Sequence, residues 1–594
     1  MLTDFLPTTK KEVELRGWDC LDIILFSGDA YVDHPSFGAA VIGRTLEAAG
    51  YKVAIVPQPD WRGDHRDFLK LGKPKLFFAI SAGSMDSMVN HYTANRRLRS
   101  DDAYTPDGRP GARPDRCTIV YSRILKQHFP DTPIVIGGIE ASMRRLTHYD
   151  YWDDRLMPSI LVDSQADLLV YGMGEKPMTA IAQWYQQQQK TPQHIPQTAF
   201  IADANDINTN TEPTLLLHSH EECIQSKRCQ AENFRHIEEQ ANTLHPKRLL
   251  QPLSPGSEKT TKTVVVNPPY PPMTTEELDA SFDLPYQRLP HPKYKGKNIP
   301  AYDMIRFSVC LHRGCFGGCA FCTISAHQGR HVVSRSKENI LREIEKIAQL
   351  PDFKGYISDL GGPSANMYRI EGKDKNICDK CKRPTCLQPT VCKNLNRDFG
   401  PILDIYRTVD QLPYIKKAFV GSGIRFDLLN DEYARELILK HVSGRLKVAP
   451  EHTEEHVLQL MRKPPFENFK RFAEFFEKTN REAHLKQQLI PYFISSHPGC
   501  TEADMAELAV KTKQMNFHLE QVQDFTPTPM TLATEMYYTG LNPYTMQPVF
   551  TARKKEQKLA QRQYFFWYKR ENKNSIIQSL RRINRTDLIN KLLN

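Results

Sequence analysis

Short apolar runs alternate with amphipathic, helix-like segments along the first third of the chain. The runs are DIILF (22–26), KVAIVPQ (52–58), KLFFAIS (75–81), PIVIGG (133–138) and DLLVYGMGE (167–175). Continuous apolar strands separated by helices are typical of a parallel sheet that is covered on both faces. The pattern therefore predicts an α/β fold with a doubly wound parallel sheet in residues 1–190.

Ligands of such folds bind beyond the carboxyl ends of the strands, so the residues that follow each predicted strand are site candidates. The candidates are Asp29 and Asp33-His34 after the first strand, residues 81–84 after the third and Gly137-Gly138 after the fourth. A lone histidine on a loop usually makes ordinary hydrogen bonds. The residues alone leave open whether this edge binds a ligand or serves as a scaffold.

The composition becomes polar after the predicted sheet, with QQQQ at 186–189 and scattered Asn and Ser. Pro-rich segments follow at residues 267–273 and 283–294. The pattern predicts a connector over residues 191–295, irregular or weakly helical at first and then extended.

A second strand-and-helix series occupies residues 296–540. Its segments are GYISDLGGP (355–363), AFVGSGIRFDLL (418–429), RLKVAPEHTEEHVLQLMRKP (445–464), QLIPYFISSHPGCTEADM (488–505) and FHLEQVQDFTPTP (517–529). The series predicts a partial (β/α) barrel, whose functional residues would lie at the carboxyl ends of its strands.

The last predicted segment is a basic helical extension over residues 541–594. Between 551 and 594 it carries twelve Lys and Arg against three Asp and Glu, which is most of the net charge of +10. Such a tail either attracts a polyanion or forms an ordinary solvated helix face. The aromatic run YFFWY at 564–568 favours docking of the tail onto the preceding domain.

Cysteine usage and hydropathy indicate the compartment. The 594-residue chain has thirteen cysteines, no N-terminal signal pattern and no apolar run long enough to cross a bilayer. We expect a cytoplasmic protein with no membrane partner, in which cysteines bind metal rather than form disulfides.

Three of these cysteines, Cys315, Cys319 and Cys322, lie within eight residues on a Gly-rich loop. Zinc sites prefer Cys pairs completed by a distant pair, which disfavours a zinc site here. A [4Fe-4S] cluster is normally held by four cysteines, so three would leave one iron open. The spacing therefore predicts a [4Fe-4S] cluster with an open coordination position.

The Cys-x3-Cys-x2-Cys spacing, with Phe321 before the last cysteine, resembles the signature of radical S-adenosylmethionine (SAM) enzymes. The resemblance implies that SAM binds the open iron and is cleaved reductively to methionine and a 5'-deoxyadenosyl radical. It also implies an electron donor such as flavodoxin or ferredoxin.

Further cofactor-binding residues follow from the same resemblance. Gly361 and Gly362 stand where such barrels place a Gly-Gly pair beside the SAM amino group. Ser422, Arg425 and Glu451, with Phe321, are the other candidates for contact with SAM. Alternatively, Arg425 and Glu451 form an ordinary ion pair with each other.

The predicted first domain is similar to the cobalamin-binding-type domain that precedes many radical SAM barrels. The Asp-x-His-x-x-Gly element of cobalamin-binding mutases is absent, because Asp33 and His34 are adjacent. Cobalamin is therefore a less favoured cofactor than a scaffold or substrate-binding role for this domain.

A second group of cysteines, CDKCKRPTCLQPTVC, interrupts the barrel series within an insertion at residues 371–398. Its members are Cys378, Cys381, Cys386 and Cys392, surrounded by Lys and Arg. Four free thiols among basic residues would be reactive, which disfavours that alternative. The group predicts a second metal site, and the sequence leaves zinc and a second iron-sulfur cluster both open.

The motifs together resemble the YgiQ-like family of radical SAM proteins. Two function classes are considered. The first is a radical SAM enzyme of undefined substrate, with methyl or sulfur transfer to RNA or protein as the suggested reaction. The alternative is a metal-stabilised binding or assembly protein that holds a polyanion through its basic tail.

Overall fold

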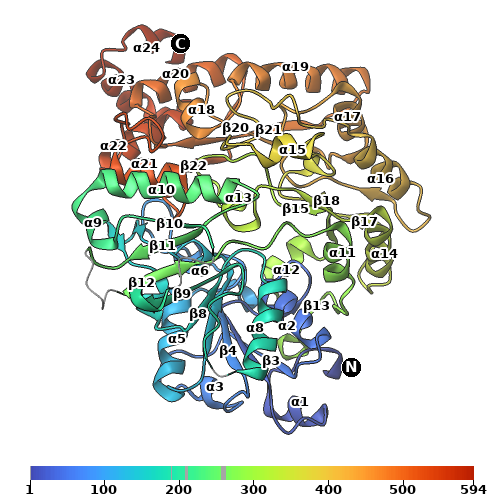
Figure 1. Cartoon of the computed structure of the whole chain (residues 1–594). Helices are drawn as coiled ribbons and strands as arrows, with labels where there is room; N and C mark the ends of the chain where they lie inside the picture. Colours follow the sequence, from blue (N-terminus) through green and yellow to red (C-terminus); the bar gives the residue numbers. More distant parts are fainter. Residues whose placement is uncertain (1, 189, 208–211, 256–261, 594) are drawn as a thin grey trace. The chain divides into compact units, whose positions relative to one another are not determined.

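The computed structural model describes residues 2–188, 190–207, 212–255 and 262–593 (Figure 1). The chain forms two compact units, one of Met1–Arg306 with Ala326–Gln328 and one of Phe307–Ser325 with Gly329–Asn594. Within the described residues, no helix combines the length and the apolar character that a membrane span requires.

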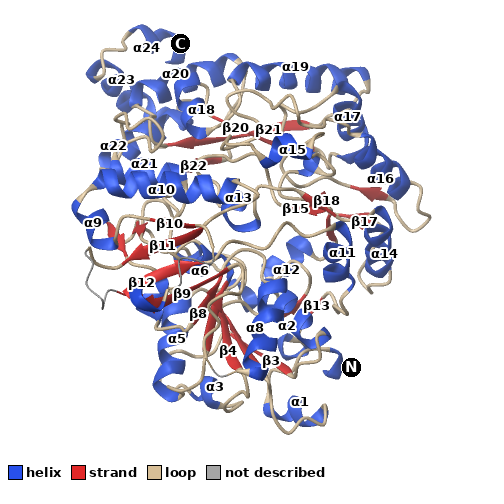
Figure 2. Ribbon diagram, viewed as in Figure 1, coloured by secondary structure: helices blue, strands red, loops and turns tan. Residues whose placement is uncertain are grey.

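The first unit is built on a parallel sheet with helices on both faces (Figure 2). Its parallel strands run in the order β3-β1-β4-β5-β8 and pair directly, as in Ile23 with Val53 and with Phe77. Their bounds are β1 (Ile23–Ser27), β3 (Val53–Pro57), β4 (Phe77–Ser81), β5 (Ile134–Gly137) and β8 (Leu168–Val170).

Alternation of side chains along each strand explains the two covered faces. Ile23 and Leu25 enter a core with residues of α2 (Gly38–Ala48) and α8 (Glu175–Gln187). On the opposite face Phe26 stacks on Phe68, with ring centroids 5.2 Å apart. Phe68 comes from α3 (Arg66–Leu69) and also packs against α5 (Cys117–His128). The predicted doubly wound sheet is confirmed.

Residues 191–295 contain more regular structure than the sequence predicts. Four strands there extend the sheet beyond β8, where β9 is antiparallel to β8, β12 to β9 and β11 to β12. Their bounds, with two helices, are β9 (Thr198–Asp203), β10 (Thr214–Leu216), α9 (His220–Gln225), α10 (Lys227–Asn242), β11 (Arg248–Pro252) and β12 (Lys262–Val266). Strands β9, β11 and β12 are no shorter than the parallel strands, but they lie between polar segments, so their apolar residues do not stand out in the sequence. Residues 208–211 and 256–261 of the predicted connector lie outside the described residues.

The Pro-rich part of the same region combines extended segments with one helix and a short 3-10 turn at Pro292–Tyr294. Its strand β13 (Leu289–Pro290) pairs with β2 (Val32–Asp33), and the Tyr294 hydroxyl accepts a hydrogen bond from the Tyr31 amide at 3.1 Å. One helix, α11 (Thr275–Asp283), interrupts it.

The second unit contains the parallel strands of the predicted barrel. Strand β14 pairs with β18, β17 with β19, and β20 with β21 and β21 with β22, all in parallel. The bounds are β14 (Ser308–Cys310), β17 (Tyr356–Ile357), β18 (Asp359–Gly361), β19 (Lys417–Ala418), β20 (Arg445–Glu451), β21 (Gln488–Ser495) and β22 (Val522–Asp524). The helices between them are α14 (Lys337–Ala348), α16 (Gly400–Asp410), α17 (Asp431–Glu436), α18 (Glu455–Met461), α19 (Phe466–Glu482) and α20 (Glu502–Gln514).

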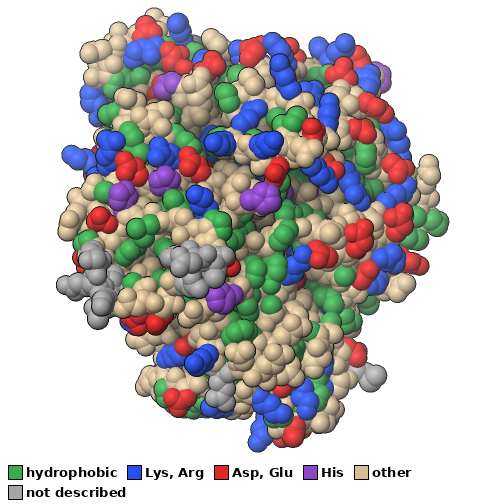
Figure 3. All heavy atoms as spheres, in the orientation of Figure 1, with side chains coloured by type: hydrophobic (Ala, Val, Ile, Leu, Met, Phe, Trp, Pro, Cys, Tyr) green, Lys and Arg blue, Asp and Glu red, His purple; other side chains and the backbone are tan. Residues whose placement is uncertain are grey.

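The C-terminal extension is helical and packs on the second unit. Its helices are α22 (Lys555–Arg562), α23 (Lys573–Arg582) and α24 (Asp587–Leu593), and α21 (Leu532–Thr539) precedes it. Tyr564 and Phe565 are fully buried, as expected for docking of the aromatic run. Several tail arginines form ion pairs, for example Arg582 with Glu502 at 2.6 Å. On the face shown in Figure 3, basic side chains are interspersed with acidic ones.

Candidate active site

The three predicted cluster ligands lie on one loop, residues 314–322, between β15 (His312–Arg313) and α13 (Ile324–Gln328). We call it the three-cysteine loop. Gly314 has a φ of +83°, and a Cβ there would lie 2.2 Å from the carbonyl oxygen of His331, so only glycine fits. The Cys315 amide donates to the carbonyl of Gly329 at 3.1 Å. The loop is therefore closed tightly behind its first cysteine.

Ala320 anchors the middle of this loop to two distant segments of the second unit. Its amide donates to the carbonyl of Met461 at the end of α18, at 3.0 Å. Its carbonyl accepts from the amide of Ala533 at the start of α21, at 2.8 Å. These bonds fix the backbone between Cys319 and Cys322.

The three thiols influence one another electrostatically. Burial raises the pKa of Cys322 to about 12, and the neighbouring sulfurs of Cys319 and Cys315 add to the effect. Burial likewise raises the pKa of Cys315. Because three thiolates here would repel one another, a bound metal centre is the natural way to hold them deprotonated.

In the described part of the chain, Asp410, Glu436 and His441 form the only group of three metal-ligating atoms that all lie within 4.8 Å of one another. The preference for a cluster over a zinc ion at the three-cysteine loop therefore rests on the spacing of its cysteines in the sequence.

Arg425 is the predicted SAM contact that lies at this loop. Its Nη1 is 3.5 Å from Sγ of Cys319. The rest of the guanidinium binds the Asp427 carboxylate through two hydrogen bonds of 2.9 and 2.7 Å. The predicted alternative, an ion pair between Arg425 and Glu451, is therefore not what the structure contains.

Glu451 lies instead 3.8 Å from the amine of Lys463, and both side chains are buried. Burial raises the pKa of this carboxyl group. Glu451 also has a φ of +68°, a left-handed conformation that costs about 1–3 kcal/mol for a residue with a side chain. Such strain at the end of β20 is typical of functional positions.

Gly361 is the last residue of strand β18, and Gly362 follows it directly. A Cβ at Gly361 would lie 2.6 Å from Oγ of Ser422, and one at Gly362 would lie 2.5 Å from the ring of His312. The Ser422 hydroxyl donates to the Asp359 carboxylate, whose pKa burial raises. The structure thus brings Gly361 and Ser422 together.

His312 is a site residue that sequence analysis missed. It is fully buried against Gly362, and neither ring nitrogen has a hydrogen-bond partner among the described residues. Burial lowers its pKa to about 3, so the ring is neutral. An unpartnered buried imidazole is costly, which suggests that a ligand satisfies it. The sequence feature that could have identified His312 is its position three residues before Cys315.

Phe321, the remaining cofactor candidate, packs edge-on against the ring of His497 with centroids 6.0 Å apart. It is half-buried. Burial lowers the pKa of His497 to about 4. The aromatic pair contributes an apolar wall beside the last cysteine.

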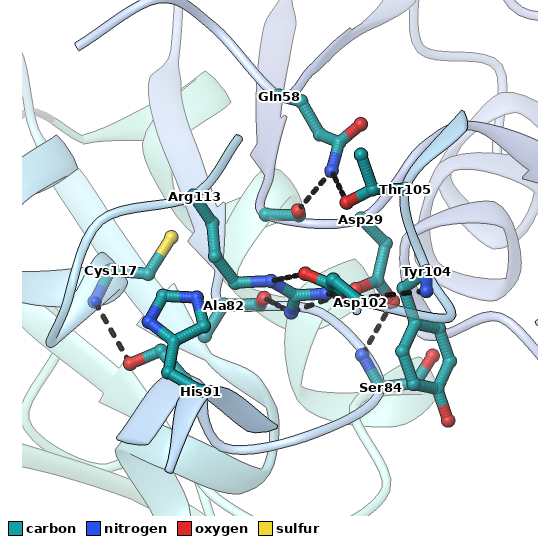
Figure 4. Close-up of polar contacts among 12 residues, drawn as sticks. Asp29, Gln58, Ala82, Ser84, His91, Asp102, Tyr104, Thr105, Arg113 and Cys117 are labelled. Atoms are coloured by element: carbon teal, nitrogen blue, oxygen red, sulfur yellow. Dashed lines mark hydrogen bonds and ion pairs between the residues drawn. The ribbon is translucent and has the colours of Figure 1, made fainter. Parts of the chain in front are cut away.

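The predicted edge of the first unit's sheet is occupied by paired charges (Figure 4). Fully buried Arg113 lies 2.9 Å from Asp29 and 3.1 Å from Asp102. The Ser84 amide donates to Asp29 at 2.6 Å. Asp29, which follows β1, and Ser84, which follows β4, therefore contact each other, as expected for residues at the carboxyl ends of parallel strands. The Asp29 carboxylate is already bound by Arg113 and by the Ser84 amide.

The other candidates of this edge behave similarly. Asp33 pairs with Arg44 at 2.5 Å, and a Cβ at Gly138 would lie 2.6 Å from Oγ of Ser81. His34 accepts from the Ser36 amide, whereas its buried Nε2 lacks a partner among the described residues.

Comparison with known proteins identifies the class of this site. The profile of the radical SAM N-terminal domain matches residues 5–308, that of the radical SAM superfamily matches residues 309–511, and a domain of unknown function (DUF3362) matches residues 520–591. The protein is a radical SAM enzyme, a class that uses a [4Fe-4S] cluster and SAM and requires a reductant.

Within this class, the chain belongs to the family of UPF0313 proteins, the YgiQ-like family that its motifs indicate. It is 64% identical to the UPF0313 protein of Bacteroides thetaiotaomicron over 100% of this chain and 98% of the relative. It is 61% identical to that of Porphyromonas gingivalis (100% and 94%) and 45% identical to that of Methanocella arvoryzae (98% and 96%). The predicted family, fold class and enzyme class are confirmed.

Among solved structures, the chain is similar to the radical SAM methyltransferase TsrM from Kitasatospora setae. The form with cobalamin and a [4Fe-4S] cluster aligns with a TM-score of 0.48 and 14% identity over 86% of this chain and 74% of that chain. The form with tryptophan and a SAM analogue aligns with a TM-score of 0.47 and 12% identity, over 86% and 75%.

Proposed function

We propose that Cys315, Cys319 and Cys322 hold the [4Fe-4S] cluster of this enzyme and leave one iron open for SAM. The observation that carries the proposal is the set of three half-buried thiols on one loop, whose backbone is anchored by hydrogen bonds at Cys315 and Ala320. When bound, the cluster supplies the electron that cleaves SAM to methionine and a 5'-deoxyadenosyl radical.

The residues around the loop would bind and orient SAM. Gly361 and Gly362 allow close approach of a ligand to the backbone at the end of β18. Arg425 offsets the negative charge of the thiolates and is placed to attract the SAM carboxylate. The free ring nitrogens of His312 offer hydrogen bonds beside Gly362.

Three further residues complete this assignment. Ser422, held by Asp359, and Glu451, held near Lys463, are polar groups for the carboxylate or ribose of SAM. Phe321 supplies an apolar contact.

For the substrate we infer an RNA or protein that receives a methyl or sulfur group. Exposed Lys375, Lys380, Lys382 and Lys393 on the insertion support an anionic partner. We infer flavodoxin or ferredoxin as the electron donor. A cytoplasmic setting is supported because all thirteen cysteines, each of them described, are free thiols.

For the first unit we propose a scaffold or substrate-binding role ahead of cobalamin binding. The charged candidates at its sheet edge are already engaged, Asp29 with Arg113 and Asp33 with Arg44. A corrin would have to displace these buried pairs or bind beside them.

The test compares wild type with the variant Cys315→Ala/Cys319→Ala/Cys322→Ala after anaerobic reconstitution. We expect the variant to form no 5'-deoxyadenosine with dithionite and SAM, and to lose the change that SAM causes in the electron paramagnetic resonance (EPR) spectrum of the reduced cluster. Cys229→Ala, on α10 of the first unit, is the control and should behave as wild type. SAM cleavage by the triple variant at the wild-type rate would refute the assignment.

A further inference from the structure

The Cys-rich insertion, residues 371–398, forms a closed loop between β18 and α16. Its ends pair through a β-bridge between Gly372 and Leu395. The Lys373 amide also donates to the carbonyl of Asn394, at 2.7 Å. Every residue of the insertion is described, and α15 (Lys375–Asp379) is its only helix or strand. A loop of this length with so little regular structure needs another source of order.

A hydrophobic core does not supply that order. The buried apolar side chains of the insertion are Leu387 and Leu395, whereas Ile377 is 55% exposed. Two leucines cannot offset the conformational entropy lost by ordering nearly thirty residues. Metal coordination can, because its binding free energy adds directly to folding.

The four cysteines of the insertion are gathered and half-buried. The Cys381 amide donates to the carbonyl of Cys378 at 3.1 Å, and the Cys392 amide to that of Cys386 at 2.8 Å. The Cys378 side chain also lies against the base of the insertion, because a Cβ at Gly372 would be 2.2 Å from its Sγ. The backbone therefore joins the four cysteines in two pairs within one closed loop.

Hydrogen-bond donors lie beside two of these sulfurs. Nδ2 of Asn394 lies 3.4 Å from Sγ of Cys378, and Nη2 of Arg330 lies 3.7 Å from Sγ of Cys386. Hydrogen bonds to ligand sulfurs are among the features that tune iron-sulfur clusters.

The insertion also rests directly on the three-cysteine loop. The Thr385 hydroxyl lies 2.8 Å from the carbonyl oxygens of both Phe316 and Gly317. The Cys386 amide donates to Phe316 as well, at 3.4 Å. Thr385, which precedes Cys386, therefore contacts Phe316 and Gly317, which follow Cys315 on the three-cysteine loop.

We propose that Cys378, Cys381, Cys386 and Cys392 ligate a second iron-sulfur cluster, which orders the insertion and thereby braces the three-cysteine loop. Four protein thiolates leave this cluster no open iron, so it does not bind SAM. The site is separate from the proposed SAM-binding cluster and can be tested separately.

The test measures iron, zinc and acid-labile sulfide per chain after anaerobic reconstitution, together with EPR spectra of the reduced protein. Wild type should hold about eight irons, as two four-iron clusters. The triple variant of the three-cysteine loop should keep about four irons, with a spectrum that SAM does not alter. The variant in which Cys378, Cys381, Cys386 and Cys392 are all Ala should also keep about four, with a spectrum that SAM alters.

Cys386→Ser is a milder variant in case the fourfold variant does not fold, and Cys229→Ala is the control. Absence of iron from the triple variant would overturn the proposal. So would one zinc per wild-type chain that Cys386→Ser abolishes, or full iron retention by the fourfold variant. A triple variant that keeps a SAM-sensitive spectrum would instead contradict the proposed function, so the two failures are distinguishable.

Discussion

Arg425 and Asp427 form a buried ion pair beside the three-cysteine loop, with side chains 8% and 3% exposed. Removing one partner of a buried pair leaves an uncompensated charge, at a cost of about 3–5 kcal/mol. We therefore expect Asp427→Ala to lower the free energy of unfolding by that amount, measured by urea titration followed by circular dichroism.

The matched control is Glu432→Ala, which removes the partner of Arg407 from an exposed pair at 2.8 Å. Exposed pairs contribute about 0–1 kcal/mol, so this change should be small. Equal effects of the two substitutions would show that the Asp427 carboxylate does not stabilise buried Arg425.

At the scale of elements, the contact between the insertion and the three-cysteine loop depends on Thr385. Thr385→Val keeps the side-chain shape but removes the hydroxyl that lies 2.8 Å from two carbonyl oxygens. The loss of about 1–2 kcal/mol should speed local opening by about 5–30-fold. We expect faster hydrogen exchange of the amides of residues 315–322, measured by mass spectrometry on the reconstituted protein.

Thr390→Val alters an exposed threonine of the same insertion and should leave this exchange unchanged. If Thr385→Val also leaves it unchanged, the insertion does not brace the loop through this hydroxyl.

At the scale of the whole molecule, buried neutral histidines make stability depend on pH. Burial lowers the pKa of His148 to about 4, and the charge of Arg144 adds to this effect. Burial also lowers the pKa of His291 to about 4. In the unfolded chain each of these histidines binds a proton below about pH 6.5, whereas in the folded protein it stays neutral down to about pH 4. The contribution of this difference to the free energy of unfolding is therefore complete above about pH 6.5. It is lost as the pH falls from 6.5 towards 4, at about 1.4 kcal/mol per pH unit for each histidine.

We expect His148→Gln to reduce the slope of unfolding free energy against pH between 6.5 and 4 by about 1.4 kcal/mol per unit. Urea titrations at several pH values measure this slope. His194→Gln, at an exposed position, is the control and should keep the slope of wild type. An unchanged slope in His148→Gln would mean that His148 is protonated in the folded protein.

Local sequence pattern was sufficient for the parallel strands of both units. Residues 23–27 and 488–495, for example, are largely apolar. Each of these segments forms a strand at the predicted position. Strands β9–β12 escaped prediction because their apolar residues lie among polar segments, so only pairing with β8 and with one another defines them. Glu451 likewise pairs with Lys463 rather than Arg425, a choice that depends on packing.

The sequence by itself determined the chemistry of this protein, because the spacing of three cysteines within one loop is a local feature that does not depend on how the rest of the chain folds. Tertiary structure alone decided which side chains lie beside the three-cysteine loop and the Gly-Gly pair. It put His312 against Gly362, Arg425 beside Cys319 and Thr385 on Phe316. These residues lie fifty to more than a hundred positions apart and come into contact only after strands have paired and helices have packed. A local sequence pattern therefore cannot predict such contacts.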